Sequence, residues 1–158
     1  MESKSLYSYD LILPVSRSSE LFNHCIEELS RATNYYGRVE RINRNCYILI
    51  QRDGGDASCR TESQHAKSEL KISFDGTGNS RVQNLPLERF VMALNDIEAI
   101  QLPVVNETGL YGKVDLDLPG DLRNVSMLRT ALQKYGLDII QAKRPVATFV
   151  IRKKVISK

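Results

Sequence analysis

The sequence predicts an α+β fold in which about three helices pack on a mostly antiparallel sheet. Apolar side chains alternate with polar ones in several short segments, which is typical of half-buried strands. Elsewhere they recur at helical spacing, and a strand–helix–hairpin pattern occurs twice. The 158 residues are 42% hydrophobic and 26% charged, which excludes collagen-like, disordered and disulfide-dense proteins.

Each half of the chain is expected to open with a strand and a helix. In the first half, apolar side chains at alternate positions of residues 9–15 predict the strand, and a helix follows over residues 18–34, starting at either of two serines. In the second half, residues 114–118 alternate in the same way, and a helix begins at Ser126 as N-cap. The shared order indicates a duplicated unit.

Each helix is followed by a Tyr-Gly pair, and Gly37 and Gly136 are predicted to end the helices because glycine readily adopts the left-handed conformation. A hairpin is expected after each glycine, with turns at residues 43–45 and 143–145. The returning strands are nearly continuous apolar runs, as in strands covered on both faces. They are Cys46–Gln51 and Val146–Ile151.

The segment between these units starts with a polar stretch, residues 53–68, which predicts an exposed loop. A strand over residues 70–74, a helix started by Asn84 and Pro86, and a short strand over residues 102–105 are expected next. The predicted organisation is a first unit over 7–52, the loop over 53–68, and a second half over 69–154 containing the repeated unit. These parts form either one compact domain or two small subdomains.

The net charge of +3 is small for a dedicated nucleic-acid-binding protein. Its basic residues still gather in two places, and the ordinary interpretation is solvated strand edges. The alternative is a cytosolic nucleic-acid-binding domain that uses these cations, although a nucleic-acid partner is not the favoured expectation. The first basic cluster consists of Arg38, Arg41 and Arg44, and the second consists of Lys143, Arg144, Arg152, Lys153, Lys154 and Lys158.

Three cysteines without a CxxC pair do not form the ligand set of a structural zinc site. Cys25 and Cys46 are expected to be buried thiols on a helix and a strand, with a bridge between them as the alternative. Cys59 lies in the polar loop and is predicted to be an exposed, reactive thiol. A redox accessory domain that uses Cys46 or Cys59 is a further alternative.

No catalytic motif, phosphate-binding loop or zinc-protease motif occurs, so we expect no enzymatic activity, no cofactor and no metal. Residues 108–112, Thr-Gly-Leu-Tyr-Gly, are most simply a chain reversal that two glycines permit. The functional alternative is a partner-facing loop with Asn106, Thr108 and Tyr111 exposed as contacts.

Four segments of the second half of the chain stand out: Leu102–Lys113, the strand after it, Ala131-Leu-Gln133 and Phe149–Ile151. Together they resemble the C-terminal half of a bacterial family of unknown function, the "soil-associated protein" family. The resemblance is good over residues 70–153 and looser over 7–52. That family usually has aspartate where this chain has Asn106. The strand–helix–hairpin unit is more weakly similar to the short N-terminal domain of secretins and TonB-dependent receptors.

The resemblance implies a location and a kind of partner rather than a reaction. Members are usually exported, and some carry a thioredoxin-like domain of the TlpA type. We therefore expect a non-catalytic accessory module with a protein partner in the periplasm or cell envelope, if the chain is excised or mature. A native start at Met1 would instead indicate the cytoplasm. No apolar run approaches the roughly 20 residues of a membrane-spanning helix, so none is expected.

Overall fold

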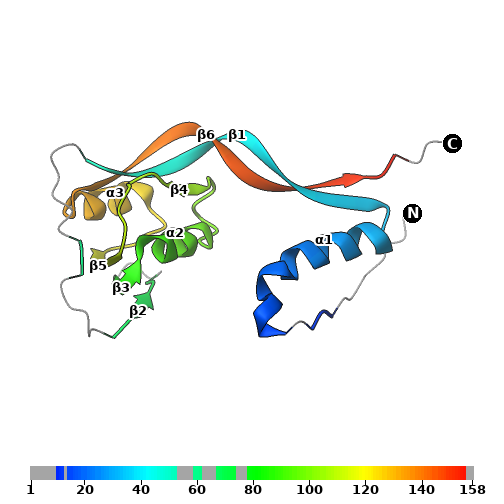
Figure 1. Cartoon of the computed structure of the whole chain (residues 1–158). Helices are drawn as coiled ribbons and strands as arrows, with labels where there is room; N and C mark the ends of the chain where they lie inside the picture. Colours follow the sequence, from blue (N-terminus) through cyan, green and yellow to red (C-terminus); the bar gives the residue numbers. More distant parts are fainter. Residues whose placement is uncertain (1–9, 13, 53–58, 62–66, 74–77, 156–158) are drawn as a thin grey trace. The chain divides into compact units, whose positions relative to one another are not determined.

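A computed structural model describes residues 10–12, 14–52, 59–61, 67–73 and 78–155. Over these residues the fold is α+β, as predicted, with three α-helices and two three-stranded sheets (Figure 1). The helices are α1 (Leu21–Ala32), α2 (Leu87–Asn95) and α3 (Val125–Gln133). The strands are β1 (Tyr35–Gln51), β2 (Glu69–Lys71), β3 (Asn79–Pro86), β4 (Val104–Asn106), β5 (Lys113–Pro119) and β6 (Leu137–Lys153).

The chain forms two compact units, and neither is continuous in sequence. Unit 1 consists of Met1–Ile42 and Val146–Lys158, and unit 2 consists of Asn43–Pro145. The long strands β1 and β6 therefore contribute residues to both units. This division differs from a boundary at the polar loop, because it joins the two ends of the chain into one unit.

One sheet has the strand order β4-β1-β6, and the other has the order β2-β3-β5. Strand β1 pairs in parallel with β4, whereas β3 pairs antiparallel with both β2 and β5. Backbone hydrogen bonds at both ends show that β6 runs antiparallel to β1: Lys154 N donates to Asn34 O, and Arg52 N donates to Gly136 O. Each strand advances eighteen residues between these bonds, so the register has no net insertion.

The two predicted hairpins are wrong. Residues 43–45 and 143–145 have a composition that favours turns. Both segments nevertheless lie inside long strands, β1 and β6, which are far apart in the sequence and pair with each other. Pro145 is tolerated because β6 is the edge strand and the register directs the proline nitrogen away from β1. Long-range pairing satisfies the backbone groups that a local hairpin would have satisfied.

The opening strand of the first unit is also wrong over the residues that the structure describes. Residues 10–12 and 14 are not in a strand, and Val15–Glu20 forms a 3₁₀ helix that leads into α1. An Arg17–Glu20 ion pair of 2.6 Å supports this turn. The duplication is therefore reduced to a helix followed by a long strand. Several positions used in these predictions lie outside the described residues: Tyr9, Leu13, Phe74, Lys158 and most of the loop 53–68.

Glycine ends only one of the two helices as predicted. Gly136 follows α3 with a φ of 69°, whereas α1 ends at Ala32 and Gly37 lies within β1. Gly37 instead gives room to the Phe149 ring, which occupies the place of a Cβ atom. Helix α3 is capped two residues earlier than predicted, because Asn124 Oδ1 accepts from the backbone N–H groups of Ser126 and Met127.

The hydrophobic core lies in unit 2. Val114, Leu116 and Leu118 project from one face of β5 and are at most 2% exposed. They belong to one apolar cluster with buried residues of α2 and α3, such as Phe90 and Leu132. All buried apolar residues of the described chain belong to this unit.

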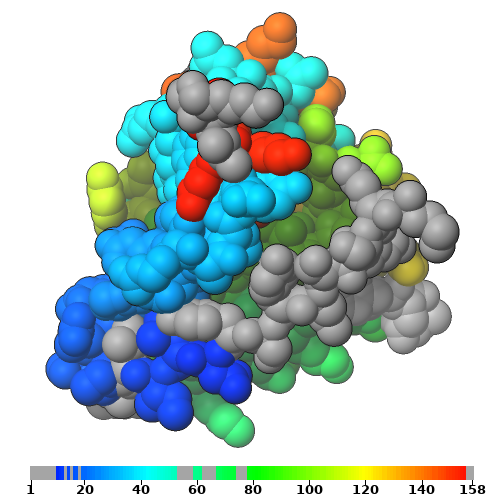
Figure 2. Space-filling model, turned by 90° about the vertical axis from the view of Figure 1, so that its right-hand side faces the viewer, coloured from blue at the N-terminus to red at the C-terminus, as the bar shows by residue number. Residues whose placement is uncertain are grey.

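Unit 1 has a helix on a two-stranded ribbon and none of its described residues is buried. Phe22 of α1 packs edge-to-face on Phe149 of β6 at 5.3 Å between ring centroids. Lys154 Nζ donates to the carbonyl oxygens of Ser30 and Thr33 at the end of α1. Figure 2 shows the red end of β6 against the light-blue residues of β1, with α1 in blue beside them. No helix within the described residues is long and apolar enough to cross a bilayer.

Candidate functional site

The loop after β4 is held by the side chains of its own first residues. Asn106 ends β4, and the next residue, Glu107, donates its N–H to Leu49 O of β1 at 2.8 Å. Asn106 Oδ1 accepts from Thr108 N at 3.1 Å and from Thr108 Oγ1 at 2.8 Å. Thr108 Oγ1 in turn accepts from Leu110 N at 3.2 Å. These successive side-chain turns fix the backbone of residues 106–110.

The remaining positions of this loop divide into an anchor and an exposed tip. Leu110 is buried in the core at 6% exposure, whereas Tyr111 is 90% exposed. The flanking glycines, Gly109 and Gly112, have φ of 67° and 98°, and a side chain at either position would be strained. The loop therefore presents the tyrosine ring from a fixed backbone.

The alternative interpretation, a partner-facing loop, expects Asn106, Thr108 and Tyr111 all to be exposed, and this is true only of Tyr111. Thr108 is buried and Asn106 is half-buried, because both side chains are used inside the loop. The Asn106 amide also donates to Glu88 Oε1 of α2 at 3.1 Å. An aspartate at 106 would lack that donor and would set a second carboxylate beside Glu88. Asparagine is thus matched to its neighbour on α2 in this chain.

The loop is also tied to β6 by an ion pair. Arg144 Nε and Nη2 donate to the two oxygens of Glu107 at 2.7 and 3.0 Å. Both side chains are more than a third exposed, so we expect this pair to orient the residues rather than to add much stability.

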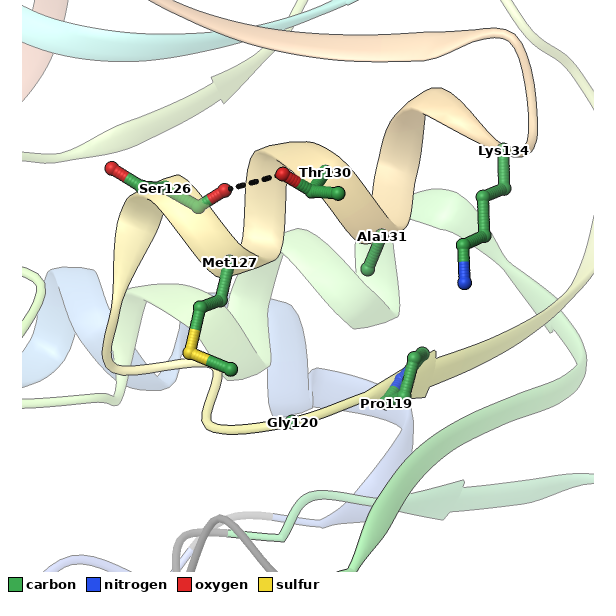
Figure 3. Close-up of a pocket in the computed structure, with 7 residues that line it drawn as sticks. All are labelled: Pro119, Gly120, Ser126, Met127, Thr130, Ala131 and Lys134. Carbon is green, nitrogen blue, oxygen red and sulfur yellow. Dashed lines mark hydrogen bonds between the residues drawn. The ribbon is translucent and has the colours of Figure 1, made fainter.

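An open groove of about 410 Å³ runs along α3 and was not predicted from the sequence. Figure 3 shows Met127 reaching toward Gly120, while Ala131 and Lys134 lie over Pro119. The groove is lined mostly by apolar surface, and the Lys134 side chain lies at one end. The Thr130 hydroxyl is used within the helix, where Oγ1 donates to Ser126 O. The only sequence signal for it is the spacing of Met127, Ala131 and Lys134 on one helix face.

All three thiols are free. Cys25 is exposed on α1, contrary to the expected burial, and Cys46 is buried with its thiol donating to Ala142 O. Cys59 is wholly buried, so the prediction of an exposed, reactive thiol is wrong. The backbone explains the error, because Asp115 N donates to Cys59 O at 2.7 Å and draws this residue against the edge of β5. Burial also raises the pKa of the Cys59 thiol, which lowers its reactivity at neutral pH.

Several cations of the two basic clusters are engaged with other groups. Arg38 and Arg152 both pair with Glu40, and Arg38 lowers the pKa of that carboxyl. Arg144 pairs with Glu107, and Lys154 binds the carboxyl end of α1. Over the described residues, no three His, Cys, Asp or Glu side chains gather closely enough to bind a metal ion.

The comparisons with known proteins add a family and no activity. No curated protein and no solved structure in the comparison matches this sequence significantly. The sequence model of one family matches residues 45–153, which includes the loop, the groove and nearly all of unit 2. This match spans more than two thirds of the chain. The chain therefore belongs to the family described as "Protein of unknown function (DUF3738)".

Proposed function

We propose that this chain is a non-catalytic interaction module of the bacterial cell envelope, which binds a protein partner through Tyr111. The exposure of Tyr111 on a fixed loop is the observation that carries the proposal. Tyrosine combines a large apolar ring with a hydroxyl group and is enriched among the residues that dominate binding energy.

The rigidity of the loop favours binding because little conformational freedom is lost on contact. The Asn106–Thr108 network, the buried Leu110 and the Glu107–Arg144 pair all hold the loop before a partner arrives. Apart from Tyr111, the polar side chains of this loop (Asn106, Glu107 and Thr108) are already used in these contacts. The loop thus suits recognition better than catalysis.

The envelope location rests on the resemblance to exported proteins described above. On the same basis, the module would act beside a thioredoxin-like domain in a longer chain. Immunoblotting of cell fractions tests the location: the proposal predicts signal in the periplasm or envelope, and a wholly cytoplasmic signal would contradict it.

Site-specific photo-crosslinking in cells tests the binding surface. A photoreactive amino acid at position 111 should give a discrete adduct with an envelope protein. The matched control is position 92, since Met92 is 57% exposed on α2 of the same unit. Tyr111→Ala should abolish co-purification of the partner while changing the free energy of unfolding by less than about 0.5 kcal/mol. Equal adducts at positions 111 and 92 would show that the tyrosine loop is not the binding surface.

A further inference from the structure

The sheet edges of this chain differ in how they are protected against pairing with another strand. The outer edge of β5 is covered, because Thr61 N donates to Lys113 O and the Tyr135 hydroxyl bonds both Asp117 N and Asp117 O. The outer edge of β4 is covered by Asn95, whose amide bonds Val104 N and Val104 O. Strand β2 is only three residues long, and two of them are charged. Such coverage, brevity and charge are the usual means of preventing edge-to-edge association.

Among the described residues, none gives strand β1 this protection over its unit 1 residues. Strand β4 pairs with it only at Tyr47–Leu49, so no described strand pairs with the edge opposite β6 over Tyr35–Ile42. The bond from Lys154 N to Asn34 O, together with the register, directs even-numbered backbone groups of β1 toward β6. The backbone groups of Gly37, Val39 and Arg41 therefore point to the open edge.

Side chains beside this edge are also incompletely covered. Phe149 contacts α1, so alternation places Tyr35, Val39 and Ile151 on the same face of the ribbon. Tyr35, Val39 and Ile151 are 47%, 54% and 55% exposed. A two-stranded ribbon is marginal by itself, whereas more strands with a helix on one face form a stable layer.

We infer that the open edge of β1 pairs antiparallel with the same edge of a second copy of this chain, with Val39 at the two-fold axis. In this register Arg38 faces Glu40 of the second copy, and Tyr36 faces Ile42 of the second copy. Both contacts occur twice by symmetry. The result is a four-stranded sheet with the order β6-β1-β1-β6 and the two α1 helices on one face.

Charge complementarity selects this register. If the two-fold axis passes through Arg38, Glu40 or Arg41, that residue lies opposite its own copy, and like charges directly opposite each other are unfavourable. Centring on Gly37 joins no opposite charges. Only the Val39 register among these matches Arg38 with Glu40 while also pairing apolar with apolar side chains.

The open edge of β6 is a poorer surface for self-association. Its charged side chains over residues 143–153 are all basic, so no self-paired register there joins opposite charges. Pro145 further removes a backbone donor from the outward-facing set. The second copy therefore occupies the β1 edge, and this contact is independent of the one proposed for Tyr111.

Sedimentation with charge-reversal variants tests the contact. The chain should change from one copy to two as its concentration rises through roughly the micromolar range, which is typical of small interfaces. Arg38→Glu and Glu40→Arg should each weaken association by about tenfold or more. Mixing the two variants should restore association. One variant then has glutamate at both positions 38 and 40, the other has arginine at both, and opposite charges face each other across the contact. Lys153→Glu makes the same charge change on β6 and should associate like the native chain.

Cysteine crosslinking tests the register. In a Cys25→Ser background, Val39→Cys should form a disulfide-linked dimer on mild oxidation, because directly opposite residues have Cα atoms at about 5.5 Å. Arg41→Cys is the matched control: it lies on the same edge and faces Gly37 of the second copy, so its thiols are too far apart. A monomer at all concentrations, no recovery on mixing, or crosslinking at 41 rather than 39 would each overturn the inference. Far-UV circular dichroism checks that each variant is folded.

Discussion

The contact between Asp138 and Arg129 joins the start of β6 to α3, and its loss should weaken unit 2 in a pH-dependent way. Arg129 Nε and Nη2 donate to the two carboxylate oxygens at 2.7 and 3.0 Å, and Ile139 N donates to Oδ1 at 2.8 Å. Asp138 is 8% exposed. The guanidinium, helped by the Ile139 N–H group, holds the pKa of the Asp138 carboxyl below its ordinary value.

Two substitutions separate the charge from the hydrogen bonds. Asp138→Asn keeps an oxygen that can accept from Ile139 N but loses the charge, and since Arg129 is half exposed we expect a cost of about 1 kcal/mol. Asp138→Ala also leaves the buried Ile139 N–H without its acceptor, which raises the expected cost to about 2–3 kcal/mol. Urea unfolding at pH 7 measures both costs. Far-UV circular dichroism is the suitable signal because the chain has no tryptophan.

The pH dependence tests the electrostatic part of this reasoning. A carboxyl whose pKa is lower in the folded than in the unfolded state stabilises the fold fully above its unfolded pKa, about 3.9 for aspartate. That contribution disappears as the pH falls through the folded pKa. The difference between the native chain and Asp138→Asn should therefore shrink between about pH 5 and pH 2. An equal difference throughout this range would refute the assignment of charge to the contact.

Three further predictions concern features that the structure corrected or added. Iodoacetamide at neutral pH should alkylate Cys25 far faster than Cys59, because the Cys59 thiol is buried and its pKa is raised. Peptide mass spectrometry measures the two rates, and equal rates would contradict the burial of Cys59. Asn124→Ala should cost about 1 kcal/mol in urea unfolding and Ser126→Ala less than half of that, since Asn124 caps α3. Tyr135→Phe should cost about 1 kcal/mol by removing both bonds to Asp117, and an unchanged unfolding midpoint would exclude this role.

Local sequence signals predicted the elements whose structure is decided locally. The apolar spacing after Pro86 correctly gave α2, and alternation over residues 114–118 gave β5. The hairpins failed because residues 43–45 and 143–145 have turn composition, while their structure is decided by pairing between β1 and β6. Pairing between segments so far apart in sequence leaves no signal in a short window.

The candidate site was predicted in part for the same reason. The positive φ angles expected of Gly109 and Gly112 are confirmed, and Tyr111 is exposed as the partner-facing alternative expects. The inward use of Asn106 and Thr108 could have been found, because their spacing of two is that of side-chain turns. The burial of Cys59 could not, since it follows from a backbone bond to Asp115 that the polar composition around it does not reveal.

The family match and the folded units end at different places, and this matters for both proposals. The match begins at residue 45, so Tyr111 lies inside it, whereas Val39 and its charged neighbours lie outside. Self-association through β1 is therefore inferred for this chain and not for the family. The match also runs to residue 153, although β6 beyond Pro145 pairs with β1 residues that precede the match. A fragment limited to residues 45–153 would leave that half of β6 without its neighbouring strand, so a fragment that retains the whole β1–β6 pairing has to begin before Tyr35.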